Sequence, residues 1–264
     1  MSHPVEGQDG PAVARWLIRE VELVAGDEAL RVEEAEAYFV GGAHRDPFAH
    51  QHPTQSDPGR WYFHRVGGSY RGGSFKGLDL TFGPPGTFGG VLIRTLRRPS
   101  GALVSGPSRC VDHLLALTGA ARVAALDDGR DALGDGALRL RPAPREVAIL
   151  RTARVGLTLK RHTPGDDRPR FLLRPDRLLT DPRGIAKGRV HTVIALHQAG
   201  ESPAAIRATT GSTAVERYLA RYDAGVRAPS FDRFVGAALR AGDYAELHGI
   251  WTVRFGGATM DAPP

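Results

Sequence analysis

The chain has 264 residues, 41% of them hydrophobic, so it can bury the core of one large domain or of a catalytic domain with a small appendage. It has no apolar run near the ~18 residues of a membrane span and no cationic, apolar leader, which favours a cytoplasmic protein without a membrane partner. The single cysteine excludes an internal disulfide and a multi-cysteine zinc site, and the net charge of +6 favours an anionic partner.

The N-terminal part of the chain predicts one helix and a β-hairpin. Residues 11–18 begin with proline, which is favoured in the first turn of a helix. Residues 20–24 and 30–39 alternate polar and apolar side chains on either side of a glycine turn, as two half-buried strands do. Residues 41–59 hold three histidines, three prolines and few apolar side chains, which predicts a long loop of the functional kind.

The next part predicts three strands and a glycine-rich hairpin. The strands, the first of them aromatic, are expected at residues 61–66, 78–82 and 90–96. Glycines punctuate residues 67–77, GGSYRGGSFKG, which predicts either a bulged hairpin or a backbone that approaches a phosphate closely. Arg71 and Lys76 would add positive charge to such a phosphate site.

Positive charge is concentrated in one block, which follows a helix expected at residues 106–117. Residues 141–190 hold 13 basic and 5 acidic side chains. Most of the basic residues are arginines, which bind phosphate through paired hydrogen bonds. We expect Arg151, Arg154 and Lys160 to contact a phosphodiester backbone, with a solvated arginine-rich surface as the alternative. Short strands are expected at residues 147–150, 155–159 and 170–173.

The C-terminal part predicts helices separated by tight turns. They are expected at residues 192–198, 203–210 and 213–222. Ser202, followed by proline, is a good N-cap for the second helix, and Ser212 is a candidate cap for the third. The layout is similar to a helix-turn-helix, in which the third helix would read DNA. The residues it would present are Thr213, Glu216, Arg217 and Arg221. Because this part carries no net charge, a helical packing unit is the alternative.

These elements predict a mixed α+β fold with a mostly antiparallel sheet, because strands and helices do not alternate regularly. We expect an α+β domain over residues 1–190 and a helical segment over residues 191–264, packed on that domain.

Acidic residues on a predicted strand are the main candidates for catalysis. Glu34, Glu36 and Tyr38 share one face of strand 30–39, because side chains alternate along a strand. A carboxylate fixed on a rigid element can act as a general base, whereas a soluble, charged edge strand is the alternative. Asp79 is either a second carboxylate near Glu36, which would make an acid–base pair, or an outward polar residue.

Several segments, in this order, carry a family resemblance. They are VARWLIREVELV, RVEEAEAYFVGG, DPFAH, GVLIRTL, SGPSRCVDHLLALTG, ARVGL and RFLL. Over residues 11–175 they resemble the methylpurine DNA glycosylase family of the alkyladenine type. The resemblance implies the fold of that family, hydrolysis of the N-glycosidic bond of alkylated or deaminated purines, and no cofactor. It also implies no metal, although His44, His50 and His52 share a loop with Asp46.

The resemblance implies roles for individual residues. Glu36 falls on the general base that activates water for attack on the sugar C1′, and Tyr38 falls on the aromatic residue that stacks against the extruded base. His50 falls on a histidine of the base pocket, with His44 as its rival. Arg94 falls on an arginine beside that pocket.

Two tyrosines of the family are missing here. If Asp79 is matched to the family's asparagine, the tyrosine that wedges into DNA becomes Gly72 and a stacking tyrosine becomes Ser69. Tyr70 or Arg71 is the nearest substitute. We expect a monomer that acts on damaged DNA, single-stranded if a wedge is lacking. An N-glycosidase of RNA or of a small nucleoside, and a non-enzymatic nucleic-acid-binding protein, are the alternatives.

Overall fold

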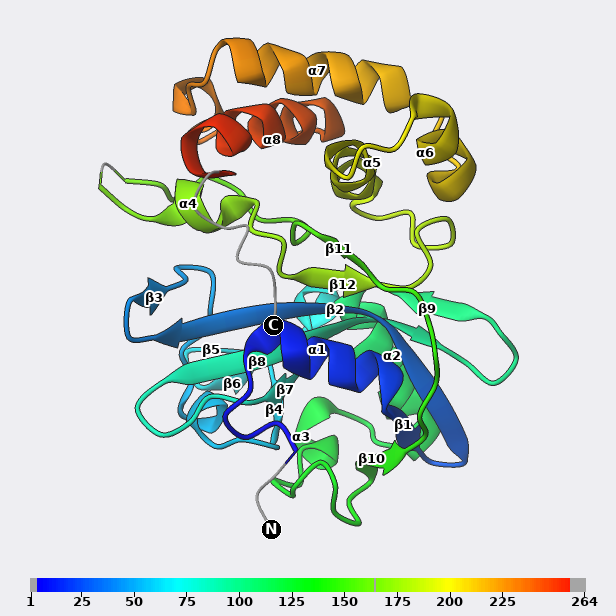
Figure 1. Ribbon diagram of the computed structural model, residues 1–264. Coiled ribbons are helices and arrows are strands. Elements are labelled where there is room, and N and C mark those ends of the chain that lie inside the picture. The colour runs from blue at the N-terminus through cyan, green and yellow to red at the C-terminus, as the bar shows by residue number, and fades with distance from the viewer. Residues whose placement is uncertain (1–3, 164, 257–264) are drawn as a thin grey trace. The chain divides into compact units, whose positions relative to one another are not determined.

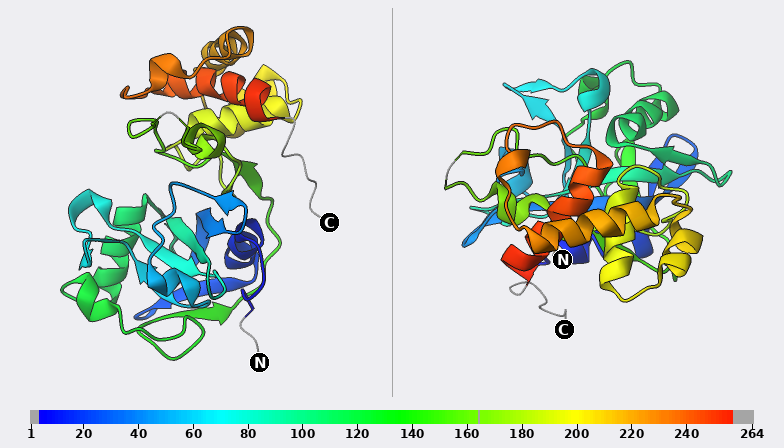
Figure 2. Two further views of the ribbon diagram at one scale, coloured as in Figure 1. Left: turned by 90° about the vertical axis from the view of Figure 1, so that its left-hand side faces the viewer. Right: turned by 90° about the horizontal axis from the view of Figure 1, so that it is seen from above.

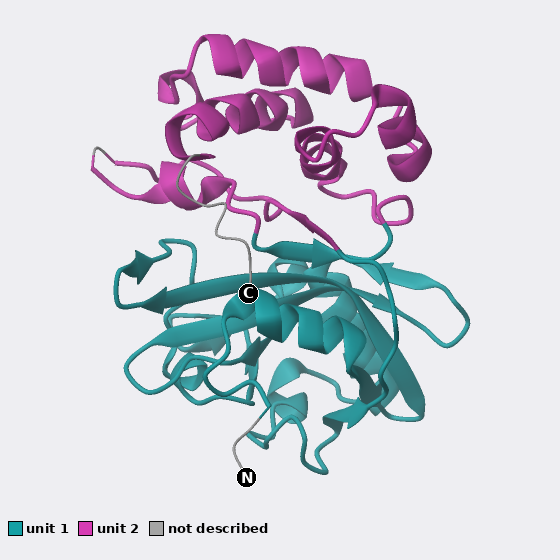
Figure 3. Cartoon of the chain, in the orientation of Figure 1, with its two compact units in different colours: residues 1–149, 176–181 teal, residues 150–175, 182–264 magenta. Residues whose placement is uncertain are grey.

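The structure is a computed structural model that describes residues 4–163 and 165–256. The chain forms two compact units, shown in different colours in Figure 3. Unit 1 comprises residues 1–149 and 176–181, and unit 2 comprises residues 150–175 and 182–264. The boundary therefore differs from the one expected at residue 190, because much of the basic block belongs with the C-terminal helices. No described helix combines the length and the apolar character that crossing a bilayer requires.

Unit 1 is built on a large antiparallel sheet in which β2 is the longest strand (Figure 1). The strand order is β10-β1-β2-β8-β7-β4, and β12 pairs with β2 further along. The strands are β1 (Val21–Ala25), β2 (Glu28–Gly41), β3 (His44–Arg45), β4 (Trp61–Phe63), β7 (Leu78–Thr81), β8 (Phe88–Arg97), β9 (Leu103–Ser105), β10 (Leu138–Pro142) and β12 (Arg177–Leu179). The prediction of a mixed α+β fold with a mostly antiparallel sheet is confirmed.

Helix α1 (Gly10–Arg19), expected at residues 11–18, covers the apolar face of this sheet. Its N-cap is Asp9, whose side chain accepts a hydrogen bond from the amide of Ala12, and Pro11 lies in the first turn. A Cβ on Gly10 would lie 2.6 Å from Cβ of Ala37, so glycine lets the helix approach β2 closely. Helix α2 (Pro107–Thr118) ends at Gly119, and α3 spans Val123–Leu126.

Some predicted elements of residues 120–175 are wrong. No strand is predicted from the sequence at residues 138–142, where β10 pairs with β1. Residues 155–159 are not a strand, because Gly156 has a φ of 84°. Residues 170–173 fall largely in helix α4 (Arg168–Leu172) instead of a strand, because Pro169 favours a first helical turn. Only β11 (Leu150–Thr152) overlaps the expected strand at residues 147–150.

Unit 2 is helical. Its main helices are α5 (Arg189–Gln198), α6 (Pro203–Thr210), α7 (Val215–Arg227) and α8 (Ala241–Phe255), with a 3-10 turn at Asp232–Phe234. Ser202 caps α6 through the amide of Ala205, as predicted, but Ser212 is not the N-cap of α7, which begins after Ala214. Helices α7 and α8 lie side by side (Figure 2). A Cβ on Gly225 would lie 2.0 Å from the carbonyl oxygen of Glu246, so this pair of helices packs with its backbones in close approach.

The three helices expected to resemble a helix-turn-helix pack around a small core of Val193, Ile206 and Val215. Two side chains of the expected reading face form ion pairs within unit 2. Glu216 pairs with Arg207, and Arg221 pairs with Glu246 at 3.3 Å. These contacts favour the alternative of a packing unit, and DNA reading by α7 stays a prediction.

We expect a buried histidine pair to make the stability of unit 2 sensitive to acid. Nδ1 of His191 lies 2.9 Å from Nε2 of His248, and burial lowers the pKa of His248 from 6.5 to about 3. Between these values the unfolded chain binds a proton that the folded chain does not, so acid favours unfolding. We expect the Tm to fall as the pH decreases from 6.5 toward 3, and to fall less in His248→Gln, as measured by calorimetry.

The half-buried His197 of α5 is the control for this prediction. His197→Gln should keep the acid sensitivity of the wild type. An undiminished fall of Tm in His248→Gln would contradict the assignment.

Candidate functional site

One face of the sheet in unit 1 carries polar side chains, and the other carries the core. The registers place five residues as successive partners across β12, β2, β8, β7 and β4: Arg177, Glu36, Leu92, Asp79 and Tyr62. Paired residues of neighbouring strands point to the same side, so these side chains share one face, which we call the polar face. Their strand neighbours Ala35 and Ile93 belong to the hydrophobic core on the other side. Polar groups buried on a central strand need partners.

Glu36 lies on the polar face and is fully buried. Its Oε2 accepts a hydrogen bond of 2.9 Å from the hydroxyl of Tyr38 and one of 3.2 Å from Nη1 of Arg94. The structure therefore brings together three residues that the sequence proposed for one site. The prediction that Glu34, Glu36 and Tyr38 share a face is confirmed by their contacts, because Arg94 bonds to both glutamates and Tyr38 bonds to Glu36. The alternative of an exposed edge strand is wrong, because β2 is a central strand.

A second buried carboxylate, Glu34, extends this network. Its Oε1 accepts hydrogen bonds from Arg177 at 2.7 Å and from Arg94 at 3.2 Å, and its Oε2 accepts one of 2.6 Å from Thr95. Burial alone would raise the pKa of Glu34, but the charges of Arg177 and Arg94 lower it. Burial likewise opposes the charge of Arg94, and the carboxylates of Glu36 and Glu34 raise its pKa above the ordinary value. Two arginines and two glutamates thus form one ionic cluster.

Asp79 lies on the polar face but does not pair with Glu36. Strand β8 runs between them, and two strand spacings of ~4.8 Å separate their backbones by about 10 Å. Asp79 and Glu36 therefore do not form the expected acid–base pair. Oδ1 of Asp79 lies 2.8 Å from Nε2 of His64, and Oδ2 lies 3.3 Å from Nε2 of Gln55. The reading of Asp79 as an outward polar residue is wrong, because it is buried.

His50 joins this group of side chains on the polar face. Its Nδ1 lies 3.2 Å from the hydroxyl of Tyr62, and its ring centroid lies 4.2 Å from that of His64. Burial, together with the positive charge of His64, lowers the pKa of His50 to about 4. Burial and the charge of Asp79 raise the pKa of Tyr62 to about 12. Neutral imidazole and phenol groups therefore face each other at this position near pH 7.

His44, the rival of His50, lies on β3. Its ring centroid is 5.7 Å from that of Phe39. The contacts to Tyr62 and His64 are made by His50. His52 stacks on Tyr62 at 4.9 Å and caps a 3-10 turn, Pro53–Ser56.

A cavity of about 560 Å³ opens beside β4 and reaches Tyr62. Its lining includes Tyr62, Tyr70, Arg65, Asp127, Thr54 and Trp61. Tyr70, expected in a substrate pocket, donates a hydrogen bond of 2.8 Å to Asp127, and the guanidinium of Arg65 lies 4.1 Å above its ring. The volume suits a small organic ligand. Tyr62 belongs both to the polar face and to the lining of the cavity. Glu36 is not among the described residues that line it.

The glycine-rich segment is an insertion between β4 and β7. Because Tyr62 pairs with Asp79, residues 64–77 lie outside the ladder, which we call the inserted segment. It contains the hairpin β5 (Arg65–Val66) and β6 (Ser69–Tyr70) and a 3-10 turn, Gly73–Phe75. Tyr62 is therefore the aromatic residue that pairs with Asp79 in the ladder. The expected hairpin is confirmed.

Two large apolar side chains of the inserted segment are exposed, Phe75 at 70% and Val66 at 64%. The segment is held to helix α2, since Ser108 donates a hydrogen bond of 2.7 Å to the carbonyl of Gly73 and Lys76 pairs with Asp112 at 2.8 Å. Sequence reasoning missed Phe75, and only its position among glycines signals it.

The basic residues proposed for phosphate binding occupy different surroundings. Arg71 donates a hydrogen bond of 3.3 Å to the carbonyl of Arg65, and Arg151 donates one to the carbonyl of Pro175. Arg154 is 1% exposed and donates to the carbonyl of Phe171 at 3.1 Å, which favours a structural role. Lys160 and Arg151 are exposed, whereas Arg71 and Lys76 are half-buried and Arg154 is buried.

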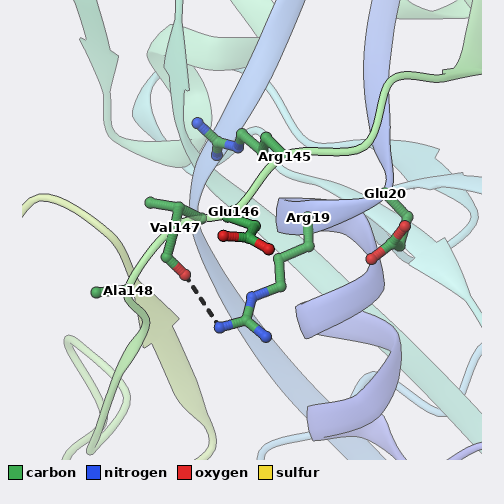
Figure 4. A pocket seen from close by; sticks show the side chains of 6 residues that line it. All are labelled: Arg19, Glu20, Arg145, Glu146, Val147 and Ala148. Atoms are coloured by element: carbon green, nitrogen blue, oxygen red, sulfur yellow. Dashed lines mark hydrogen bonds between the residues drawn. The ribbon is translucent and has the colours of Figure 1, made fainter.

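Part of the basic block forms ion pairs with carboxylates of the same chain. Arg141 pairs with Glu22, and Arg145 pairs with Glu33 at 2.9 Å. A second cavity, of about 610 Å³, lies beside Arg19 and Arg145 (Figure 4). The carboxylates of Glu20 and Glu146 line it as well, so its charge does not favour an anion. The excess of arginine between residues 141 and 190 is therefore partly structural.

Comparison of the chain with models of protein families and with curated proteins finds no match. In residues 4–163 and 165–256, no group of three or more His, Cys, Asp or Glu side chains is arranged to hold a metal ion.

Proposed function

We propose that the protein is a DNA glycosylase-like hydrolase that cleaves the N-glycosidic bond of damaged purines, with Glu36 as the base that activates water. The observation that carries the proposal is the buried carboxylate of Glu36, held by Tyr38 and Arg94 on the polar face in one row with Asp79 and Tyr62. The sequence resemblance over residues 11–175 supports the same reaction.

The chemistry needs a fixed carboxylate and an aromatic environment. The bond between C1′ of the sugar and N9 of the purine breaks, and its electron pair leaves with the base. The oxygen of water bonds to C1′ while Glu36 accepts the proton that the water loses. The negative charge of the carboxylate also stabilises the cationic character that develops on the sugar. Tyr62 and His50 provide flat, neutral groups against which a purine can pack, and Tyr38 lies beside Glu36.

The test is an excision assay. Oligonucleotides with a single alkylated or deaminated purine, single-stranded and duplex, are incubated with the protein and then treated with alkali to cleave abasic sites. We expect cleavage at the damaged position. Absence of cleavage with every DNA substrate, together with release of base from matched RNA or from free nucleosides, would favour the alternative substrates.

Phe75 is an exposed aromatic side chain of the kind that can fill the gap left by a base extruded from duplex DNA. Extruding a base leaves a gap in the stack, and glycosylases and other DNA-bending proteins fill such gaps with an apolar side chain. Phe75 is exposed on a segment anchored to α2, with Lys76 beside it. This observation favours DNA with stacked bases over a free nucleoside as the substrate.

Replacing Phe75 by alanine should weaken excision from duplex DNA. Stacking of an aromatic side chain contributes about 1–3 kcal/mol, so we expect kcat/KM on the duplex to fall roughly 5- to 100-fold. Excision from a single strand should change less, because no gap has to be filled. Val253→Ala, which removes an exposed apolar side chain of α8, is the control. Equal losses on duplex and single strand would contradict the role of Phe75.

A further inference from the structure

The two units of the chain differ in charge. Unit 2 holds 17 basic and 9 acidic residues, a net charge of +8, whereas unit 1 holds 18 basic and 20 acidic residues, a net charge of −2. Residues 191–264 alone carry no net charge, and the excess arises because residues 150–175 and 182–190 belong to the same compact unit. A basic domain favours a polyanionic partner, so the charge of unit 2 does not argue against binding of nucleic acid by its helices.

Three helices of unit 2 have the connections of a helix-turn-helix. Helices α5, α6 and α7 pack against one another around Val193, Ile206 and Val215 (Figure 1). Residues 211–214 join α6 to α7, and the first of them, Gly211, ends α6 in the left-handed conformation with a φ of 64°. A short turn with glycine between the second and third helices is typical of this motif, whose third helix enters the major groove of DNA.

The first half of α7 leaves one side of the helix open to a partner. Val215 and Leu219 pack into the small core that this helix shares with α5 and α6. Arg217, Ala220 and Arg221 lie on the opposite side, because the α-helix repeats every 3.6 residues, and all three are exposed. The close backbone contact with α8 lies in the second half of α7. The exposed side of the first half is therefore free to enter a groove.

Three exposed arginines lie around the turn between α6 and α7: Arg183, Arg207 and Arg217, which we call the arginine corner. The side chain of Arg183 lies beside the turn, since a Cβ on Gly211 would be 3.7 Å from its Cγ. Within the described part of the chain, no carboxylate pairs with Arg183 or Arg217. Arg207 pairs with Glu216, but their side chains are 50% and 59% exposed, and exposed pairs are weak. A phosphate can therefore replace this carboxylate.

From these observations we infer that unit 2 is a separate DNA-binding module, in which the first half of α7 lies in the major groove of duplex DNA. Arg183 and Arg207 contact backbone phosphates, and Arg217, in the first turn of α7, contacts the edges of bases. The inference goes beyond the proposed function, because affinity for undamaged DNA requires neither Glu36 nor a damaged base. Retention on DNA would then belong to unit 2 and base excision to unit 1.

The experiment measures binding of the full-length protein to a labelled, undamaged duplex of random sequence, by fluorescence anisotropy at salt concentrations from about 50 to 200 mM. Arg183→Ala and Arg207→Ala should each weaken binding about 5- to 10-fold near 0.1 M salt and reduce the slope of log K against log salt by about 1. The control is Arg254→Ala, which removes the same charge. Arg254 donates a hydrogen bond of 3.1 Å to the carbonyl of Pro229, beyond the other end of α7, and its replacement should change neither quantity.

A second measurement tests the contact of α7 with bases. Duplexes that bind the wild type tightly are selected from a random pool and are then bound to Arg217→Ala. We expect a common sequence to be enriched and Arg217→Ala to bind it roughly 5- to 100-fold more weakly, because a bidentate contact to a base is lost. Selection without an enriched sequence would overturn the placement of α7 in the major groove.

Other outcomes decide against the inference. Wild-type affinity in Arg183→Ala and Arg207→Ala, or an equal loss in Arg254→Ala, would show that the arginine corner is not the binding surface. Tighter binding of the wild type to RNA of the same sequence would assign an RNA partner instead of DNA. The proposed function is tested separately, since both corner variants should keep the single-turnover excision rate at saturating protein. Binding that depends on the corner, without excision of any damaged base, would overturn the proposed function and leave this inference intact.

Discussion

Glu36→Gln is expected to abolish base excision while leaving the fold intact. Glutamine keeps the size of the side chain and can still bond to Tyr38 and Arg94, but it cannot take a proton from water. General base assistance contributes roughly 10²–10⁴ in rate, so single-turnover excision should fall by that factor. The measurement is release of the damaged base under single-turnover conditions, with the Tm recorded alongside.

Glu34→Gln is the matched control for this variant. Glu34 is equally buried, lies two residues away on the same face and bonds to the same Arg94. Its replacement should lower the Tm, because Arg177 loses an ionic partner, and should leave most of the excision rate. If Glu36→Gln retains the wild-type rate, or if both variants lose activity in proportion to their Tm, the ionic cluster is structural and Glu36 is not the base.

The second large effect concerns stability. Arg177→Ala should destabilise unit 1 by about 3–5 kcal/mol, because it leaves the buried carboxylate of Glu34 with a single arginine. Arg177 is fully buried and lies opposite Glu36 in the β2–β12 register. Urea unfolding followed by tryptophan fluorescence gives the free energy of unfolding for comparison with the wild type.

Arg207→Ala is the control for Arg177→Ala. Arg207 also pairs with a glutamate, Glu216, but both side chains are about half exposed, at 50% and 59%. Exposed ion pairs contribute at most about 1 kcal/mol, so this variant should unfold near the wild-type midpoint. A loss of the same size in both variants would show that burial of the Arg177 pair is not what stabilises the sheet.

Local patterns predicted the elements that position the site. The alternation along residues 30–39 predicted that Glu34, Glu36 and Tyr38 share one face, and their contacts show that they do, although the β2–β8 pairing is shifted on either side of Glu34. The cap at Ser202 and the stop at Gly119 were also predictable, because each depends on a few adjacent residues.

Contacts between distant segments were not predictable from these patterns. Arg177 reaches Glu34 across 143 residues, and nothing in its own segment RPDRLL indicates that β12 pairs with β2. His64 meets Asp79 because β4 pairs with β7 in one register, which the inserted segment conceals. The pairing of Tyr62 with Asp79 could not be found by counting residues across that insertion.

The path of the chain between the two units has a practical consequence. Strand β12 belongs to unit 1, although segments of unit 2 precede and follow it. A fragment truncated after residue 149 would lack Arg177 and would leave two acidic side chains with one guanidinium in a dehydrated interior. An expression fragment of the sheet alone should therefore extend past residue 181, or carry a neutral residue in place of Glu34.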